Sequence, residues 1–140
     1  MMETPLKIIK KYQIQPVKRL GQSFLVDNNI TSRIVDALKS DKGDSVVEIG
    51  AGLGAMTAMI APRVTKIVAL EIDPKLVAVL TKELKDIPNV EIIHGDVLEY
   101  DFSAPAGGRA RIKVIGNIPY NVSSQILFRL IEFRDHISSA

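Results

Sequence analysis

The sequence lacks cysteine throughout its 140 residues, which excludes disulfide bonds and thiolate metal sites. Its two histidines, His94 and His136, lie far apart, and no spacing typical of metal ligands occurs. No apolar stretch approaches the roughly 20 residues that a membrane-spanning helix needs. The amino-terminal segment lacks the apolar core and cleavage site of a signal peptide. We therefore expect one metal-free domain in a reducing cytoplasm, without membrane contact.

Positive charge is concentrated near the amino terminus, although the formal net charge of the chain is only +2. The first twenty residues oppose a single acid, Glu3, with five basic side chains: Lys7, Lys10, Lys11, Lys18 and Arg19. A basic arm of this kind attracts phosphate backbones. A solvated, frayed terminus is the alternative interpretation of the same charges.

Short β-rich runs alternate with helical patterns along the chain, which predicts an α/β fold with a mostly parallel, doubly wound sheet. The expected strands span residues 45–49, 66–71, 90–93 and 112–116. The expected helices span about 29–38, the glycines to Pro62, Pro74 to just before Pro88, and about 123–133. Asp27 or Asn28 caps the first helix, and Asp73-Pro74 is a strong start for the third.

Four such strands form only about half of a doubly wound sheet. The last of them would lie at an unprotected edge, which natural sheets usually cover. Either the sheet ends unusually early or the chain is a truncated piece of a larger protein. We expect truncation, and we expect the piece to self-associate through its open edge.

The glycines after the first expected strand permit a tight turn and let a ligand approach the backbone closely. Their spacing, Gly50-x-Gly52-x-x-Ala55, also fits a dinucleotide fingerprint, and Glu71 lies where an acid that binds the ribose of NAD is expected. The loop therefore indicates a nucleoside cofactor without deciding which one. A turn used only for packing remains the alternative.

Three acids lie beside the expected strand ends. Glu48 can orient the glycine loop or engage a ligand amine through water. Glu71 can accept hydrogen bonds from both ribose hydroxyls, and its alternative role is a surface charge. Asp96 can accept from an adenine amino group, and its alternative role is to cap the following turn. Together these acids favour S-adenosylmethionine.

The tetrapeptide Asn117-Ile118-Pro119-Tyr120 follows the fourth expected strand and completes a recognisable set. The chain resembles the ribosomal RNA adenine N6-dimethyltransferases of the KsgA (RsmA) type, and the related Erm methyltransferases share most of the marks. The resemblance extends from about Lys18 to Leu130 and is carried by five segments: Gly21-Gln22-Ser23-Phe24-Leu25, Glu48-Ile49-Gly50-Ala51-Gly52-Leu53-Gly54, Glu71-Ile72-Asp73, Gly95-Asp96-Val97 and Asn117-Ile118-Pro119-Tyr120-Asn121.

This resemblance implies a Rossmann-like class I methyltransferase fold and a division of roles in the cofactor site. Gln22, Ser23 and Leu25 would contact the methionine end, with Gly50 and Gly52 beneath the cofactor. The ribose and the adenine would be held by Glu71, Ile72, Asp96 and Val97. Residues 1–28 would form a basic arm with a cofactor-contacting segment, ahead of a partial methyltransferase domain at 29–140.

The resemblance also implies the chemistry of Asn117, Pro119 and Tyr120, although an isolated tetrapeptide of this kind is equally a turn. The Asn117 side-chain oxygen and the Pro119 carbonyl would accept hydrogen bonds from the two N–H groups of an adenine amino group, and Tyr120 would stack on the base. Two positions depart from the family, which usually has Asn or His at Ser23 and often has Pro at Gln125. Family members also continue into further strands and a small helical domain.

The expected function is dimethylation of adenines in small-subunit ribosomal RNA during ribosome assembly, with S-adenosylhomocysteine as the product and no metal. The expected partner is an immature small subunit, with the basic arm on its phosphates and the complete protein a monomer. Three alternatives remain open: an Erm-like enzyme of large-subunit RNA, a non-catalytic binding fragment and an NAD-dependent oxidoreductase. We expect the chain alone to be nearly inactive.

Overall fold

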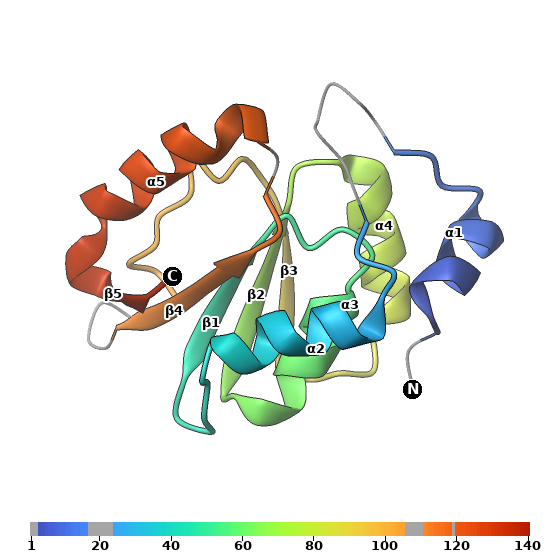
Figure 1. Cartoon of the computed structure of the whole chain (residues 1–140), viewed down its shortest axis with the longest axis horizontal. Helices are drawn as coiled ribbons and strands as arrows, with labels where there is room; N and C mark the ends of the chain where they lie inside the picture. The colour runs from blue at the N-terminus through green and yellow to red at the C-terminus, as the bar shows by residue number, and fades with distance from the viewer. Residues whose placement is uncertain (1–2, 17–23, 106–110, 119) are drawn as a thin grey trace.

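The computed structural model describes residues 3–16, 24–105, 111–118 and 120–140, with only the backbone described at Tyr120 (Figure 1). Its centre is a five-stranded sheet in the order β3-β2-β1-β4-β5, in which all neighbouring strands are parallel. The strands are β1 (Ser45–Ile49), β2 (Lys66–Glu71), β3 (Val90–His94), β4 (Ile112–Gly116) and β5 (Ile137–Ser139). The α-helices are α1 (Pro5–Tyr12), α2 (Asn28–Ala37), α3 (Ala55–Ile60), α4 (Pro74–Glu83) and α5 (Ser123–Glu132), and the 3-10 turns are η2 (Ala61–Arg63), η3 (Tyr120–Val122) and η4 (Arg134–His136).

The α/β class and the parallel sheet are confirmed, and the number of strands is corrected from four to five. The additional strand, β5, pairs with the beginning of β4 at Ile112 and Lys113. The edge of β4 is therefore covered at its start, contrary to the expectation of a wholly open edge. Such a short strand carries no run of alternating apolar residues, so the sequence pattern does not reveal it.

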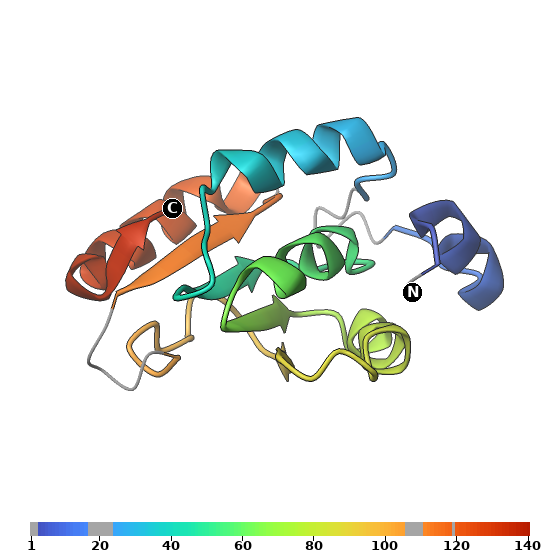
Figure 2. The ribbon, with the colours of Figure 1, turned by 90° about the horizontal axis from the view of Figure 1, so that it is seen from below.

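The sheet lies between two layers because alternate residues of each strand face opposite sides. Helices α2 and α3 cover one face through a core that contains Val46, Ile60 and Ile67. Helix α4 packs on the same face against Ala69 and Ile92, as Figures 1 and 2 show. The other face is covered by α5 and the loop after β3, with a core that includes Val47, Val68, Phe102, Val114 and Ile126.

The first helix, α1, is packed against the body of the molecule beside α4 (Figure 1). Ile8 is fully buried in a cluster with Leu76 and Val79 of α4. The Tyr12 hydroxyl donates to the Glu83 carboxylate at 2.8 Å, and Lys11 pairs with the same group at 3.2 Å. The described part of the basic arm is therefore a docked helix and not a frayed terminus. No helix in the described ranges is long and apolar enough to cross a membrane.

The direction in which successive strands are added to the sheet reverses between β1 and β4, and this switch point places the candidate site. From β1 the chain moves outward through β2 to β3, and it then returns to the opposite side of β1 to form β4. Loops on the two sides of such a switch point separate at the carboxyl ends of the strands and leave a crevice for a ligand. The glycine loop follows β1, and Asn117 follows β4.

Candidate cofactor site

The glycine loop after β1 is fixed by backbone hydrogen bonds to β2. The N–H groups of Gly50 and Ala51 both donate to the Leu70 carbonyl, at 2.8 and 3.2 Å. Gly50 and Gly52 have φ values of +69° and +59°, in the left-handed region where residues with a Cβ are strained. The loop therefore exposes bare backbone at the switch point, and α3 begins immediately after it.

Glu71 holds this loop against the turn after β2. One carboxylate oxygen accepts the Gly52 N–H at 2.8 Å, and the other accepts the Asp73 N–H at 2.9 Å. The residue is only 5% exposed, so it is not the surface charge that the sequence left open. Each carboxylate oxygen has a second lone pair and can accept a further hydrogen bond from a ligand hydroxyl.

Glu48 lies beneath the loop and is 1% exposed. The Thr57 hydroxyl of α3 donates to its carboxyl group. Burial raises the pKa of Glu48 to about 8, helped by the negative charge of Glu71 and opposed by the Thr57 hydrogen bond. Glu48 is one of the residues around a small cavity, together with Leu25, Gly50 and Asn117.

The turn after β2 presents an exposed apolar side chain, and the turn after β3 presents one carboxylate. Asp96 accepts the Leu98 N–H at 2.9 Å through one oxygen, which is the capping role expected as an alternative. Its other oxygen makes no hydrogen bond within the described ranges. Ile72 is 45% exposed although it is apolar, and its carbonyl lies 3.0 Å from the His94 ring. The exposed Ile72 side chain and the second oxygen of Asp96 together suit a flat base with an amino group.

Strand β4 approaches β1 closely just before Asn117. A Cβ atom on Gly116 would lie 2.8 Å from the Ile49 carbonyl oxygen, a distance that real side chains do not tolerate. A Cβ on Gly50 would lie 4.0 Å from the Asn117 carbonyl oxygen, so the two loops meet across the switch point. The Asn117 side chain itself is exposed.

The described site residues therefore gather at one end of the sheet. Hydrogen bonds and cavity walls join Leu25, Gly50, Gly52, Glu71 and Asn117. The Gly95 N–H donates to the Glu71 carbonyl at 3.0 Å and connects the Asp96-Val97 turn to them. Gln22, Ser23, Pro119 and the side chain of Tyr120 lie outside the described residues. No group of three metal-ligating side chains occurs among those that are described.

Comparisons with known proteins identify the family. The model described as ribosomal RNA adenine dimethylase matches residues 15–139. The chain belongs to this family. A protein of Syntrophus aciditrophicus named ribosomal RNA small subunit methyltransferase A is 47% identical over 136 residues, which are 96% of this chain and 49% of the relative. The chain spans about half the length of the curated relatives that it matches.

Solved structures of similar proteins confirm the fold of this chain. A dimethyladenosine transferase from Plasmodium falciparum superposes with a TM-score of 0.71 at 28% identity, over 82% of this chain and 40% of that one. The 23S rRNA methyltransferase ErmE gives a TM-score of 0.71 at 30% identity, over 79% and 43% of the two chains. The predicted family and the Rossmann-like methyltransferase fold are thus both correct.

Two contacts in the candidate site were not predicted from the sequence. Thr57 lies on the face of α3 that meets Glu48, and no motif identifies it. Phe24 packs its ring 3.7 Å from the position that a Cβ of Gly52 would take. This aromatic residue belongs to the Gly21–Leu25 segment, so its place in the motif was the available signal. The ring closes one side of the glycine loop.

Proposed function

We propose that this chain binds S-adenosylmethionine at the carboxyl ends of β1 to β4. In the same proposal it forms the cofactor-binding part of an enzyme that dimethylates adenine N6 in small-subunit ribosomal RNA. The main support is the convergence of the glycine loop, Glu71 and Asn117 at the switch point of a chain that belongs to the adenine dimethylase family. The name of the Syntrophus relative supports the small subunit as the target.

The described residues fit a nucleoside cofactor. The left-handed glycines leave backbone open for close approach, and Glu71 retains lone pairs for a ribose. Exposed Ile72 offers an apolar contact for the adenine, and Asp96 with Val97 lies on the turn beside it. Leu25 would contact the methionine end together with Gln22 and Ser23.

The proposed mechanism depends on alignment and needs no strong base, because the methylated nitrogen would carry a positive charge and would release its excess proton to water. When bound, the cofactor supplies an electrophilic methyl group on a sulfonium leaving group. The Asn117 side-chain oxygen and the Pro119 carbonyl would accept hydrogen bonds from the two N–H groups of the adenine amino group. Its nitrogen would then become more pyramidal, with the lone pair directed at the methyl group. Tyr120 would stack on the extruded base, which contributes roughly 1–3 kcal/mol per base.

The proposal extends to product and partners. S-adenosylhomocysteine would be the product, and an immature small subunit in the cytoplasm would be the substrate particle. The complete enzyme would be a monomer, and this chain alone would self-associate along the part of β4 beyond Lys113, which β5 leaves uncovered. A large-subunit target is the second candidate, because ErmE has the same TM-score and slightly higher identity than the dimethyladenosine transferase.

The test uses a chimera that joins this chain to the following half of the Syntrophus aciditrophicus relative. Single-turnover transfer of labelled methyl to immature small subunits is measured for Asn117→Ala, Tyr120→Ala and the exposed control Gln125→Ala. We expect Asn117→Ala to slow transfer by about 100-fold, as loss of one preorganised hydrogen-bonding group does at other reacting centres. Tyr120→Ala should lower it less, and Gln125→Ala should leave it unchanged. A near-normal rate for Asn117→Ala would defeat the proposed role.

A further inference from the structure

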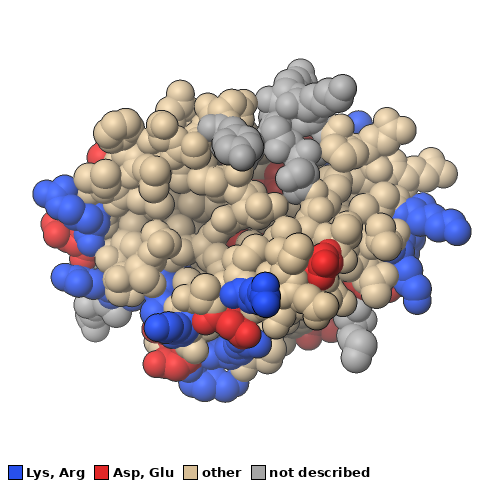
Figure 3. All heavy atoms as spheres, in the orientation of Figure 1, with Lys and Arg blue, Asp and Glu red and all other residues tan. Residues whose placement is uncertain are grey.

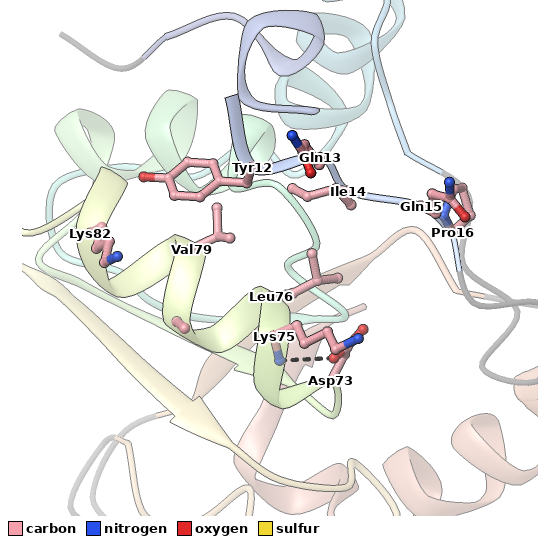
Figure 4. A pocket seen from close by; sticks show the side chains of 11 residues that line it. Tyr12, Gln13, Ile14, Gln15, Pro16, Asp73, Lys75, Leu76, Val79 and Lys82 are labelled. Atoms are coloured by element: carbon pink, nitrogen blue, oxygen red, sulfur yellow. Dashed lines mark hydrogen bonds between the residues drawn. The ribbon is translucent and has the colours of Figure 1, made fainter. Parts of the chain in front are cut away.

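A second concavity lies away from the cofactor site, between α4 and the segment that follows α1. It is a groove of about 760 Å³ whose walls include Tyr12 to Pro16 on one side and residues of α4 on the other (Figure 4). It shares no lining residue with the small cavity beneath the glycine loop. One end reaches Asp73, whose backbone N–H donates to Glu71. The groove therefore begins beside the cofactor site and leads away from it.

The groove has an apolar floor and a cationic rim. Leu76 and Val79 are 2% and 6% exposed, and Ile14 faces them from the opposite wall (Figure 4). Lys75 and Lys82 are exposed on the α4 side of the rim. They are seven residues apart, so they share one face of the helix at a separation of about 10 Å along its axis. Neither forms an ion pair with any carboxylate in the described ranges.

The acids near the groove are already engaged, so its accessible charge is positive. Asp73 is 6% exposed and caps α4 by accepting the Lys75 N–H at 2.9 Å. Glu83 is bound to Tyr12 and Lys11. The ammonium groups of Lys11 and Lys82 lie 5.3 and 6.0 Å from the centre of the Tyr12 ring. These contacts keep cationic groups at the mouth of the groove.

We propose that this groove binds a single strand of RNA, with phosphates at Lys75 and Lys82 and bases against the apolar floor. The inference rests on the proposed function, which makes RNA the substrate. A cationic track beside apolar surface suits a strand whose bases are unpaired. A duplex hides its base faces and leaves the floor without a partner. Because the groove starts beside the cofactor site, it would hold another part of the RNA that carries the target adenine.

The first test introduces a charge of either sign inside the groove at Ala78, an exposed wall residue of α4. Binding of a fluorescent single-stranded RNA of about ten nucleotides, a length within the usual range of site sizes, is followed by anisotropy. Ala78→Glu should weaken binding by about fivefold or more, and Ala78→Lys should strengthen it. The same changes at Ala37, exposed on α2, are the matched controls and should alter affinity less than about twofold.

The second test removes the two rim lysines together in Lys75→Gln/Lys82→Gln. Loss of two phosphate contacts to a single strand should make the dependence of log affinity on log salt shallower by about 1.4. Arg33→Gln/Lys66→Gln removes the same charge elsewhere and should not change the slope. Duplex RNA of equal length should bind more weakly than the single strand.

Binding of S-adenosylhomocysteine to the same variants separates the two proposals. If it is retained while groove and control variants bind RNA equally, the groove is not the site and the proposed cofactor function stands. Absence of RNA binding by the unaltered chain, or displacement of RNA by S-adenosylhomocysteine, would also overturn the groove proposal. Failure of the unaltered chain to bind S-adenosylhomocysteine would instead overturn the proposed function.

Discussion

Two buried carboxyl groups beside the glycine loop differ in their hydrogen-bond partners. Glu71 accepts hydrogen bonds from two backbone N–H groups and holds the glycine loop against the turn after β2. Glu48 has one hydroxyl donor, Thr57, in surroundings from which water is excluded. Burial therefore raises the pKa of Glu48 to about 8, and the group carries a proton at neutral pH.

The stability of the chain should depend on pH through Glu48. Its pKa is about 8 in the folded state and near 4.5 when unfolded, so the folded chain retains a proton that the unfolded chain loses in this window. The free energy of unfolding should therefore fall as pH rises through the window, by up to about 1.4 kcal/mol per unit. Below the window the stabilisation is fully present.

Glu48→Gln keeps an acceptor for Thr57 but cannot ionise, so it should flatten this dependence and exceed the parent in stability near pH 8. Urea unfolding at several pH values between 4.5 and 8 measures the effect, with the exposed Glu99→Gln as control. Equal slopes for Glu48→Gln and the parent would show that Glu48 is not the titrating group.

At the scale of the elements, the close contact of β1 with β4 positions Asn117. Gly116→Ala would place a Cβ 2.8 Å from the Ile49 carbonyl oxygen and 3.2 Å from the Ile118 side chain. The backbone cannot yield easily there, so overpacking should lower the free energy of unfolding by about 1–3 kcal/mol. Gly43→Ala is the matched control, since its Cβ would meet only Asp41, at 3.4 Å. Equal denaturation midpoints for the two variants would refute the close-contact argument.

Much of the element pattern could be predicted from local sequence signals. The bounds of β1, β2 and β4 were predicted as observed, and the caps Asp27 and Asp73 occur where expected. The docking of α1 was missed, because its lysines were interpreted as a charged arm. The apolar partner that buries Ile8 is α4, about seventy residues later.

Within the site, the sequence predicted which strand ends meet but not how the side chains are bonded. The placement of Glu71 and Asn117 follows from parallel strands, because their carboxyl ends share one edge of the sheet. The Gly52 and Asp73 bonds of Glu71 depend on the local path of two turns. No periodicity encodes that path. The Thr57 contact of Glu48 similarly depends on the rotation of α3 against β1.

On the scale of the whole molecule, the distribution of charge and the share of its relatives' length that the chain spans bear on the proposed binding of RNA. Charged side chains lie mostly around the margins of the face shown in Figure 3, and its centre is largely uncharged. The curated relatives are about twice as long as this chain. RNA affinity rises steeply with the number of phosphate contacts, so half of such a protein should bind its substrate weakly.

The chain alone should therefore transfer much less methyl than the chimera with the second half of the Syntrophus relative, although both bind the cofactor product. Labelled methyl donor with immature small subunits measures transfer. Light scattering reports whether the chain self-associates through β4. Comparable turnover by the two proteins, with the chain monomeric, would show that these 140 residues suffice for activity.

The central claim is that the glycine loop and Glu71 form a site for S-adenosylmethionine and not for NAD. Calorimetric titration of the chain with S-adenosylhomocysteine and with NAD tests it directly, with Glu71→Ala measured alongside and its folding checked by circular dichroism. We predict tighter binding of S-adenosylhomocysteine, weakened in Glu71→Ala by about 1.5–3 kcal/mol through loss of charged hydrogen bonds. Tighter binding of NAD, or unchanged affinity in a folded Glu71→Ala variant, would contradict the account.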